Sequence, residues 1–279
     1  MDLGVFLAVI AAAAMHAGWN AILKIRLDPF IAMVLVNAVC GVIALPFALW
    51  FGLPELHVWP WILASVVLHL CYYLTLTEAY RLADMGQVYP VARGSAPLMT
   101  TLVSLAVLGE PIDLQGFLGV LLIAVGIVTI AWRRSGQHFD PRALRLALIC
   151  GVSITAYSLV DGLGARTAVN PHLYTSWLFV VDSLLIIAVA LLWKGPAALR
   201  PAAAFIGPGF AGGAMSLAAY WICIWAMTKA PIGLVSAVRE SSVLFGAVIA
   251  VVVLREPLRA NRVAAAGLIV AGLVLIKLH

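Results

Sequence analysis

Six charged side chains lie within long apolar stretches of the sequence, and they are the first candidates for chemistry. A charge inside hydrocarbon costs at least about 2.5 kcal/mol, so each one needs a partner or a water-filled cavity. Such residues therefore tend to mark substrate or ion paths. The six are Glu78, Arg93, Asp161, Asp182, Arg239 and Glu240. The polar residues His16, Asn20 and His69 lie in similar stretches and join them.

Arg93 and Glu240 occupy equivalent positions in an internal repeat of the chain. One interpretation is a charge pair that lines a substrate path and meets the carboxylate and the amine of a zwitterion. The other is a structural ion pair that holds two helices together, with Arg239 paired to Glu78 or Asp182. A pair that exchanges its partner for substrate could do both.

Aromatic side chains with a polar group accompany these charges. Tyr73 and Tyr220 are also repeat equivalents; His69 and Tyr80 share a helical stripe with the first, and Trp221 lies beside the second. Such rings suit a pocket for an apolar side chain or a cation. Packing or lipid contact is the alternative interpretation.

Two further helix faces complete the predicted binding set. His16, Trp19 and Asn20 share a face of the first apolar stretch, and Tyr157 shares a face with Asp161 in the sixth. The predicted substrate-binding residues are therefore His16, Trp19, Asn20, His69, Tyr73, Glu78, Tyr80, Tyr89, Arg93, Tyr157, Tyr220, Trp221, Arg239 and Glu240.

The elements that must position these residues are membrane-spanning helices. Hydrophobic residues make up 64% of the 279 residues, charged residues 10%, and the mean hydropathy is +1.09. Soluble domains carry about 25% charged residues, so lipid must cover much of this surface. A span needs about 20 apolar residues. We predict an all-α membrane protein with ten transmembrane helices near 3–23, 30–51, 59–82, 86–108, 113–132, 142–165, 172–193, 203–228, 232–254 and 260–278.

Lysine and arginine are unequally distributed over the links between these helices. The links after the odd-numbered helices hold twelve, including Lys24, whereas the opposite side holds only Arg166, Lys229 and Lys277. Positive charge collects on the cytoplasmic side, so we expect both termini on the periplasmic side of a bacterial inner membrane. Lys24 then lies near the cytoplasmic surface, where its amine can reach water. The net charge of +5 forms no clustered basic face, which argues against a nucleic-acid partner.

The chain repeats itself. Gly86 matches Gly233, and Glu110-Pro111 matches Glu256-Pro257 after a slip of one residue. Two five-helix halves follow, residues 1–135 and 136–279. Because five is odd, the second half must enter the membrane upside down, and inverted repeats typically place a binding site at the midplane between them.

These features resemble the EamA family of the drug/metabolite transporter (DMT) superfamily. The resemblance rests on the Glu-Pro links before a glycine-containing last helix, on Gly-x-Val near the start of the fourth and ninth helices, and on Ala-Gly-Trp-Asn in the first. It implies a central cavity enclosed by helices 1, 3, 4, 6, 8 and 9, with helices 5 and 10 peripheral. Bacterial members of this size resemble amino-acid exporters, the YddG type being the nearest named group.

Enzyme motifs are absent from the sequence: it has no GxSxG, HExxH or GxxxxGK[ST]. The four cysteines show no zinc spacing, so buried reduced thiols are expected, with no cofactor and no metal. The leading function is a secondary transporter that exports small organic metabolites, foremost amino acids, by alternating access. Its partners would be this substrate and the bilayer, and no oligomer is required. A carrier for drugs, quaternary amines, purines or sugar phosphates is the alternative, followed by a channel.

Overall fold

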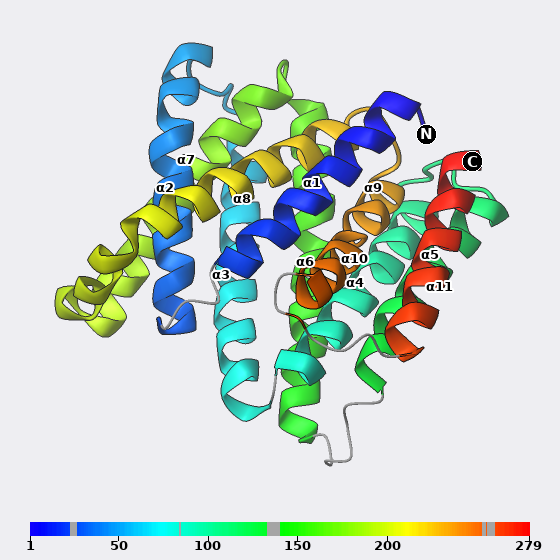
Figure 1. Cartoon of the computed structure of the whole chain (residues 1–279). Coiled ribbons are helices and arrows are strands. Elements are labelled where there is room, and N and C mark those ends of the chain that lie inside the picture. The colour runs from blue at the N-terminus through cyan, green and yellow to red at the C-terminus, as the bar shows by residue number, and fades with distance from the viewer. Residues whose placement is uncertain (23–26, 84, 133–139, 253–254, 256–259) are drawn as a thin grey trace.

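A computed structural model describes residues 1–22, 27–83, 85–132, 140–252, 255 and 260–279, and for 85–87, 89 and 130–132 it describes the backbone alone. These residues form α-helices and one 3₁₀-helix (Figure 1). The elements are α1 (Leu3–Ile22), α2 (Pro29–Phe51), α3 (Trp59–Leu82), α4 (Met85–Ala106), α5 (Leu114–Trp132), α6 (Pro141–Thr167), α7 (Pro171–Lys194), η1 (Pro196–Phe205), α8 (Ile206–Met227), α9 (Ile232–Arg239), α10 (Ser242–Val252) and α11 (Ala260–Leu278).

Eight helical stretches among the described residues are long and apolar enough to cross a membrane. The chain is therefore a multi-pass membrane protein. α4 and α5 are not among the eight, and the described part of α5 is a shorter apolar helix, Leu114–Thr129. The predicted positions of the helices agree with the structure to within a few residues, whereas the predicted count of ten spans is not reached by this criterion.

Three helices begin with an aspartate or asparagine that is followed by a proline. Asp28, Asp140 and Asn170 each accept a hydrogen bond from a backbone N–H of the first turn, and a proline follows each of them. A short polar side chain satisfies a free N–H there, and proline at the first helical position has none to satisfy. These caps explain why α2, α6 and α7 start where the sequence predicts.

Asp28 also connects two distant links. Its carboxylate lies 3.3 Å from the Lys194 ammonium, which joins the start of α2 to the end of α7. Burial raises the pKa of Asp28, but the Ile31 amide and Lys194 outweigh that effect and hold it below its ordinary value of 3.8.

Alternate links lie at the same end of the molecule. Asp113, in the link between α4 and α5, pairs with the C-terminal His279 at 2.8 Å. Glu110 in the same link pairs at 2.6 Å with Arg166 near the end of α6. Both termini lie at this end (Figure 1). The opposite end holds the pair between Asp28 and Lys194.

Helices of the first half pair with helices of the second. α1 packs on α8, α3 on α6, α2 on α7, α4 on α9 and α5 on α11. This pattern is unchanged when α1–α5 are exchanged for α6, α7, α8, α9–α10 and α11. The repeat is therefore visible in the packing as well as in the sequence.

The packing of α5 on α11 shows the exchange residue by residue. A β-carbon added to Gly272 would lie 2.5 Å from the carbonyl oxygen of Gly119, and one added to Gly126 would lie 3.0 Å from that of Ala265. The two helices are thus antiparallel. Gly126 and Gly272, which follow the two Glu-Pro links by 16 residues each and so match in the repeat, make equivalent close approaches. Small residues let the backbones meet here.

The ninth predicted helix is interrupted. α9 ends at Arg239 and α10 begins at Ser242, whereas the sequence predicts one helix over 232–254. The amides of Glu240 and Ser241 bond to the carbonyls three residues earlier, at 3.0 Å each, which is the tighter 3₁₀ pattern. Breaks within membrane-spanning helices are found where the backbone is buried in protein or lines a cavity. The break between α9 and α10 lies next to the charged residues Arg239 and Glu240.

The core lies around α9, every residue of which is buried. Large exposed leucine, valine and tryptophan side chains cover the outside, as lipid contact requires. Cys40, Cys150 and Cys223 are buried as expected. The expectation is wrong for Cys71, which is exposed because it lies on the outer side of α3.

Candidate functional site

A cavity of about 100 Å³ lies between the two halves, lined by side chains from α1, α2, α3, α4, α6, α7, α8 and α9. The predicted binding residues that line it are His16, Trp19, His69, Tyr73, Arg93, Tyr157, Tyr220 and Arg239. The structure thus brings together residues from six helices that the sequence could assign only one helix at a time.

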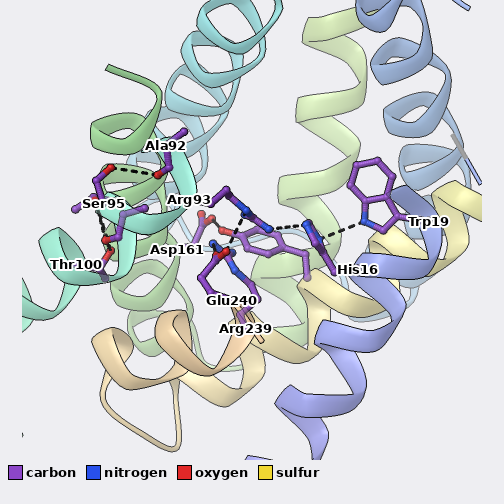
Figure 2. A network of polar contacts seen from close by, with 12 residues as sticks. His16, Trp19, Ala92, Arg93, Ser95, Thr100, Asp161, Arg239 and Glu240 are labelled. Atoms are coloured by element: carbon purple, nitrogen blue, oxygen red, sulfur yellow. Dashed lines mark hydrogen bonds and ion pairs between the residues drawn. The ribbon is translucent and has the colours of Figure 1, made fainter. Parts of the chain in front are cut away.

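Two arginines and one glutamate form the cluster on one wall. Arg93 Nε lies 3.1 Å from Glu240 Oε2, and Arg239 Nη2 lies 3.6 Å from Glu240 Oε1. All three side chains are buried, and Glu240 is not among the cavity-lining residues. Figure 2 shows the three side chains pointing toward one another. Two positive charges against one negative charge leave this wall with an excess of positive charge.

The predicted alternatives for these charges are resolved in part. The pairing of Arg93 with Glu240 across α4 and α9 is present. Arg239 pairs with Glu240, its neighbour in the sequence, and not with Glu78 or Asp182. Arg239 also lies over the ring of Tyr220, with 5.6 Å between the guanidinium carbon and the ring centroid.

α1 contributes His16 to the same wall. The Arg93 guanidinium bonds to His16 Nε2, and Trp19 Nε1 lies 3.3 Å from His16 Nδ1 (Figure 2). An arginine donor at Nε2 requires that nitrogen to be an acceptor, so His16 is neutral in this arrangement. Asn20, predicted for the same face, instead donates to the His16 carbonyl oxygen of its own helix at 2.7 Å.

A second charged wall was not predicted. Asp182 on α7 lines the cavity, and its Oδ2 accepts a hydrogen bond of 2.9 Å from the Tyr73 hydroxyl. The same hydroxyl lies 3.1 Å from Asn37 Oδ1 on α2. Asp182 could be recognised from sequence as a charge in an apolar stretch, whereas Asn37 gave no signal.

Aromatic rings connect the two walls. His69 stacks on Tyr157 at 4.1 Å between centroids and lies 5.7 Å from Tyr220 and 6.1 Å from Tyr73. The order is therefore Arg239, Tyr220, His69, Tyr73 and Asp182. Of the two interpretations of the aromatic stripes, the cavity is the one that the geometry of these four rings supports.

Asp161 anchors this aromatic group from behind. It is fully buried and accepts hydrogen bonds from the hydroxyls of Tyr174, at 2.9 Å, and Tyr220. Asp161 lies near the end of its apolar stretch, where solvation at the membrane boundary is the alternative to burial, and its full burial contradicts that alternative. Two neutral donors satisfy the carboxylate, and its role is to hold the Tyr220 ring in place.

Other predicted residues lie away from the cavity. Glu78 is half exposed and pairs with Arg81 at 3.0 Å. Trp221 donates to His172 Nδ1 at 2.8 Å and lines a groove elsewhere on the surface. Tyr80 packs against a cluster formed by α3, α4 and α6, and the side chain of Tyr89 lies outside the described residues. No group of three or more His, Cys, Asp or Glu side chains among the described residues could hold a metal ion.

The Glu-Pro link after α4 closes one end of the molecule over the cavity. Glu110 accepts a hydrogen bond from the Ile232 amide at 2.8 Å and pairs with Arg166, which donates to the carbonyl oxygens of Met227 and Ala230 at 2.8 and 3.0 Å. These contacts join the ends of α4, α6 and α8 to the start of α9. We call this set the Glu110 latch. The equivalent Glu256 lies outside the described residues.

One comparison with known proteins identifies the family and another identifies the fold. The sequence model of the EamA-like transporter family matches residues 2–132 and again 142–278. A solved crystal structure of a protein superposes with a TM-score of 0.81 at 19% identity, over 100% of this chain and 98% of its own. At that identity the likeness shows the fold alone. No curated protein sequence matches the chain.

Proposed function

The chain belongs to the EamA-like transporter family, and on this premise we propose that it exports amino acids from the cytoplasm by alternating access. Membership establishes a transporter of the DMT superfamily. The substrate, the direction and the mechanism are proposed from the cavity and its surroundings.

The proposed topology has ten spans in two inverted halves, residues 1–135 and 136–279, in the bacterial inner membrane. The exchange symmetry of the helix pairs supports it, as does the antiparallel contact of α5 with α11. The excess of lysine and arginine on one side favours periplasmic termini. Both termini, the Glu110 latch and the pair between Asp113 and His279 then lie on the periplasmic side.

The observation that carries the proposal is a cavity between the halves with an excess of positive charge on one wall. A buried arginine can bind a carboxylate with two parallel hydrogen bonds, so Arg93 and Arg239 suit the carboxylate of an amino acid. The rings of Tyr157, Tyr220 and His69 offer an apolar surface to its side chain.

The cavity is too small for most amino acids as it stands. Its volume of about 100 Å³ corresponds to about three water molecules at ~30 Å³ each. The cavity must therefore widen to hold most amino acids, and the Glu110 latch closes the periplasmic end of the proposed topology. Rocking of the two halves would open the cytoplasmic end first and the periplasmic end after the latch breaks.

The test is flux of labelled amino acids into proteoliposomes that contain the purified protein, with protein-free liposomes as the control. We expect saturable flux that unlabelled amino acids compete for. Flux no greater than in empty liposomes, across the amino acids, would refute the proposal. The same competition screen includes purines and sugar phosphates, and stronger competition by one of these would identify it as the substrate class.

Quaternary amines are the second candidate, because six tryptophan, tyrosine and phenylalanine rings line the cavity and such rings attract cations. The excess of positive charge on the arginine wall is unfavourable for a ligand that carries only positive charge. Competition by a tetraalkylammonium ion that is stronger than competition by any amino acid would favour this class.

A further inference from the structure

The carboxylate of Asp182 is buried in the cavity wall and forms no ion pair with a lysine or an arginine among the described residues; the basic group that acts on it is the imidazole of His69. Asp182 is 4% exposed, and the hydroxyl of Tyr73 is the side-chain donor it receives. A buried carboxylate with one neutral donor is an expensive arrangement, because a buried charge is normally paired or receives several donors. The other buried carboxylates differ: Glu240 faces two arginines, Glu110 faces Arg166, and Asp161 receives two tyrosine hydroxyls.

Asp182 also faces a space that a ligand can occupy. It lines the same cavity as Arg93 and Arg239, but from α7, which packs on α2 and α3, whereas the arginines come from α4 and α9. The two walls carry opposite charge. Glu240, which the sequence suggested for the amine of a zwitterion, is already held by both arginines and does not line the cavity.

We propose that Asp182, with Tyr73 and Asn37, forms an ammonium-binding subsite opposite the arginine wall. This inference rests on the proposed function and identifies the group that binds the ammonium group of the amino acid. An alkylammonium donates to Asp182 and to Asn37 Oδ1, both of which are acceptors. The face of Tyr73 adds an attraction for the cation.

The subsite makes a specific demand on ligands. A ligand with both charges meets both walls, whereas a ligand that lacks the amine leaves Asp182 unpaired. The loss of a hydrogen bond to a charged group corresponds to a change in affinity on the order of 10- to 100-fold. The cavity therefore selects zwitterions over simple carboxylic acids.

Three ligands of similar shape separate the two walls: leucine, 4-methylpentanoate, which lacks the amine, and 3-methylbutylammonium, which lacks the carboxylate. Their dissociation constants are measured by calorimetry on the full chain in lipid nanodiscs. We expect Asp182→Asn to weaken leucine and 3-methylbutylammonium on the order of 10- to 100-fold and to leave 4-methylpentanoate within about twofold. Glu78→Gln, which removes a carboxylate outside the cavity, is the matched control and should change none of them.

The outcomes separate the subsite from the proposed function. If Asp182→Asn weakens all three ligands alike, or none, the subsite is refuted although amino-acid transport stands. If the wild-type protein binds 3-methylbutylammonium through Asp182 but neither binds nor carries leucine, the subsite stands and the proposed function falls. Equal wild-type affinity for leucine and 4-methylpentanoate also overturns the subsite.

A second measurement does not depend on the folding of a variant. Cys223 lines the same cavity as Asp182, so a ligand that is bound at Asp182 and fills this cavity shields it. We expect 3-methylbutylammonium to slow the reaction of Cys223 with a maleimide in the wild-type protein, and to leave the exposed Cys71 unaffected. Unchanged labelling of Cys223 at a concentration that saturates binding would overturn the subsite.

Discussion

Breaking the Glu110 latch should open the cavity toward the side that carries the termini. Glu110→Gln keeps an amide oxygen that can accept from the Ile232 amide but loses the ion pair with Arg166 at 2.6 Å. The rest of the closed end, including the bonds of Arg166 to the carbonyls after α8, is unchanged. The variant should therefore weaken the closed state of this end without changing the fold.

The magnitude follows from burial. Removing one partner of a buried pair costs about 3–5 kcal/mol. Glu110 is almost fully buried, but the side chain of Arg166 is 32% exposed and partly screened by water. A loss of about 1–2 kcal/mol is the reasonable expectation, which corresponds to a factor of about 5–30 in the ratio of open to closed states.

Cys223 supplies the assay, since it lines the cavity and is fully buried in the closed structure. A membrane-impermeant maleimide is added to right-side-out vesicles, and peptide mass spectrometry measures the labelling of Cys223. The rate should rise about 5- to 30-fold in Glu110→Gln. Glu55→Gln, at the same end of the molecule but exposed, is the control. A melting temperature that falls while the Cys223 rate stays at the wild-type value would show that the latch stabilises the fold without gating the cavity.

Three further outcomes are expected. Arg93→Ala or Glu240→Ala should lower transport more than tenfold, because each removes one charge from a buried cluster of two arginines and one glutamate and so changes the charge of the cavity wall. Lys24→Ala should have little effect, and equal, small losses from all three variants in a flux assay would show that the pair is peripheral. Gly272→Val should lower the free energy of unfolding by about 1–3 kcal/mol by overpacking, and Gly267→Val, which meets open space, should not; equal melting temperatures would contradict this packing. The pKa of Asp28 is lower in the folded state, so the stabilising effect of its carboxylate is present above the ordinary pKa of 3.8 and is lost as the pH falls through the lower folded pKa. The difference in melting temperature between the wild type and Asp28→Ala should therefore shrink on acidification. A difference that grows would contradict the assignment.

Symmetry explains which parts of the site the sequence could predict. Arg93 and Glu240 are repeat equivalents, and in the proposed arrangement of inverted halves equivalent positions meet where they lie close to the twofold axis, as these two do. The same relation predicted Tyr73 and Tyr220, both of which line the cavity. Helix starts were predictable because Asp28, like the other caps, marks them chemically.

The parts that were missed depend on contacts between helices that no spacing relates. Asn37, Tyr73 and Asp182 come from three different helices, and nothing in the sequence sets one beside another. The break at Glu240 has no proline or glycine next to it, so composition gave no reason to divide the helix. Glu78 was chosen because it lies in an apolar stretch, but it is near the end of α3, where Arg81 and water satisfy it.

Counterflow of leucine tests the central claim most directly, namely that one cavity between two inverted halves is exposed to each side in turn. Proteoliposomes loaded with unlabelled leucine should take up labelled leucine faster than vesicles loaded with buffer, with saturation, and Arg93→Ala should abolish the acceleration. Uptake that does not saturate and is indifferent to the internal leucine would indicate a continuous pore and would contradict the account.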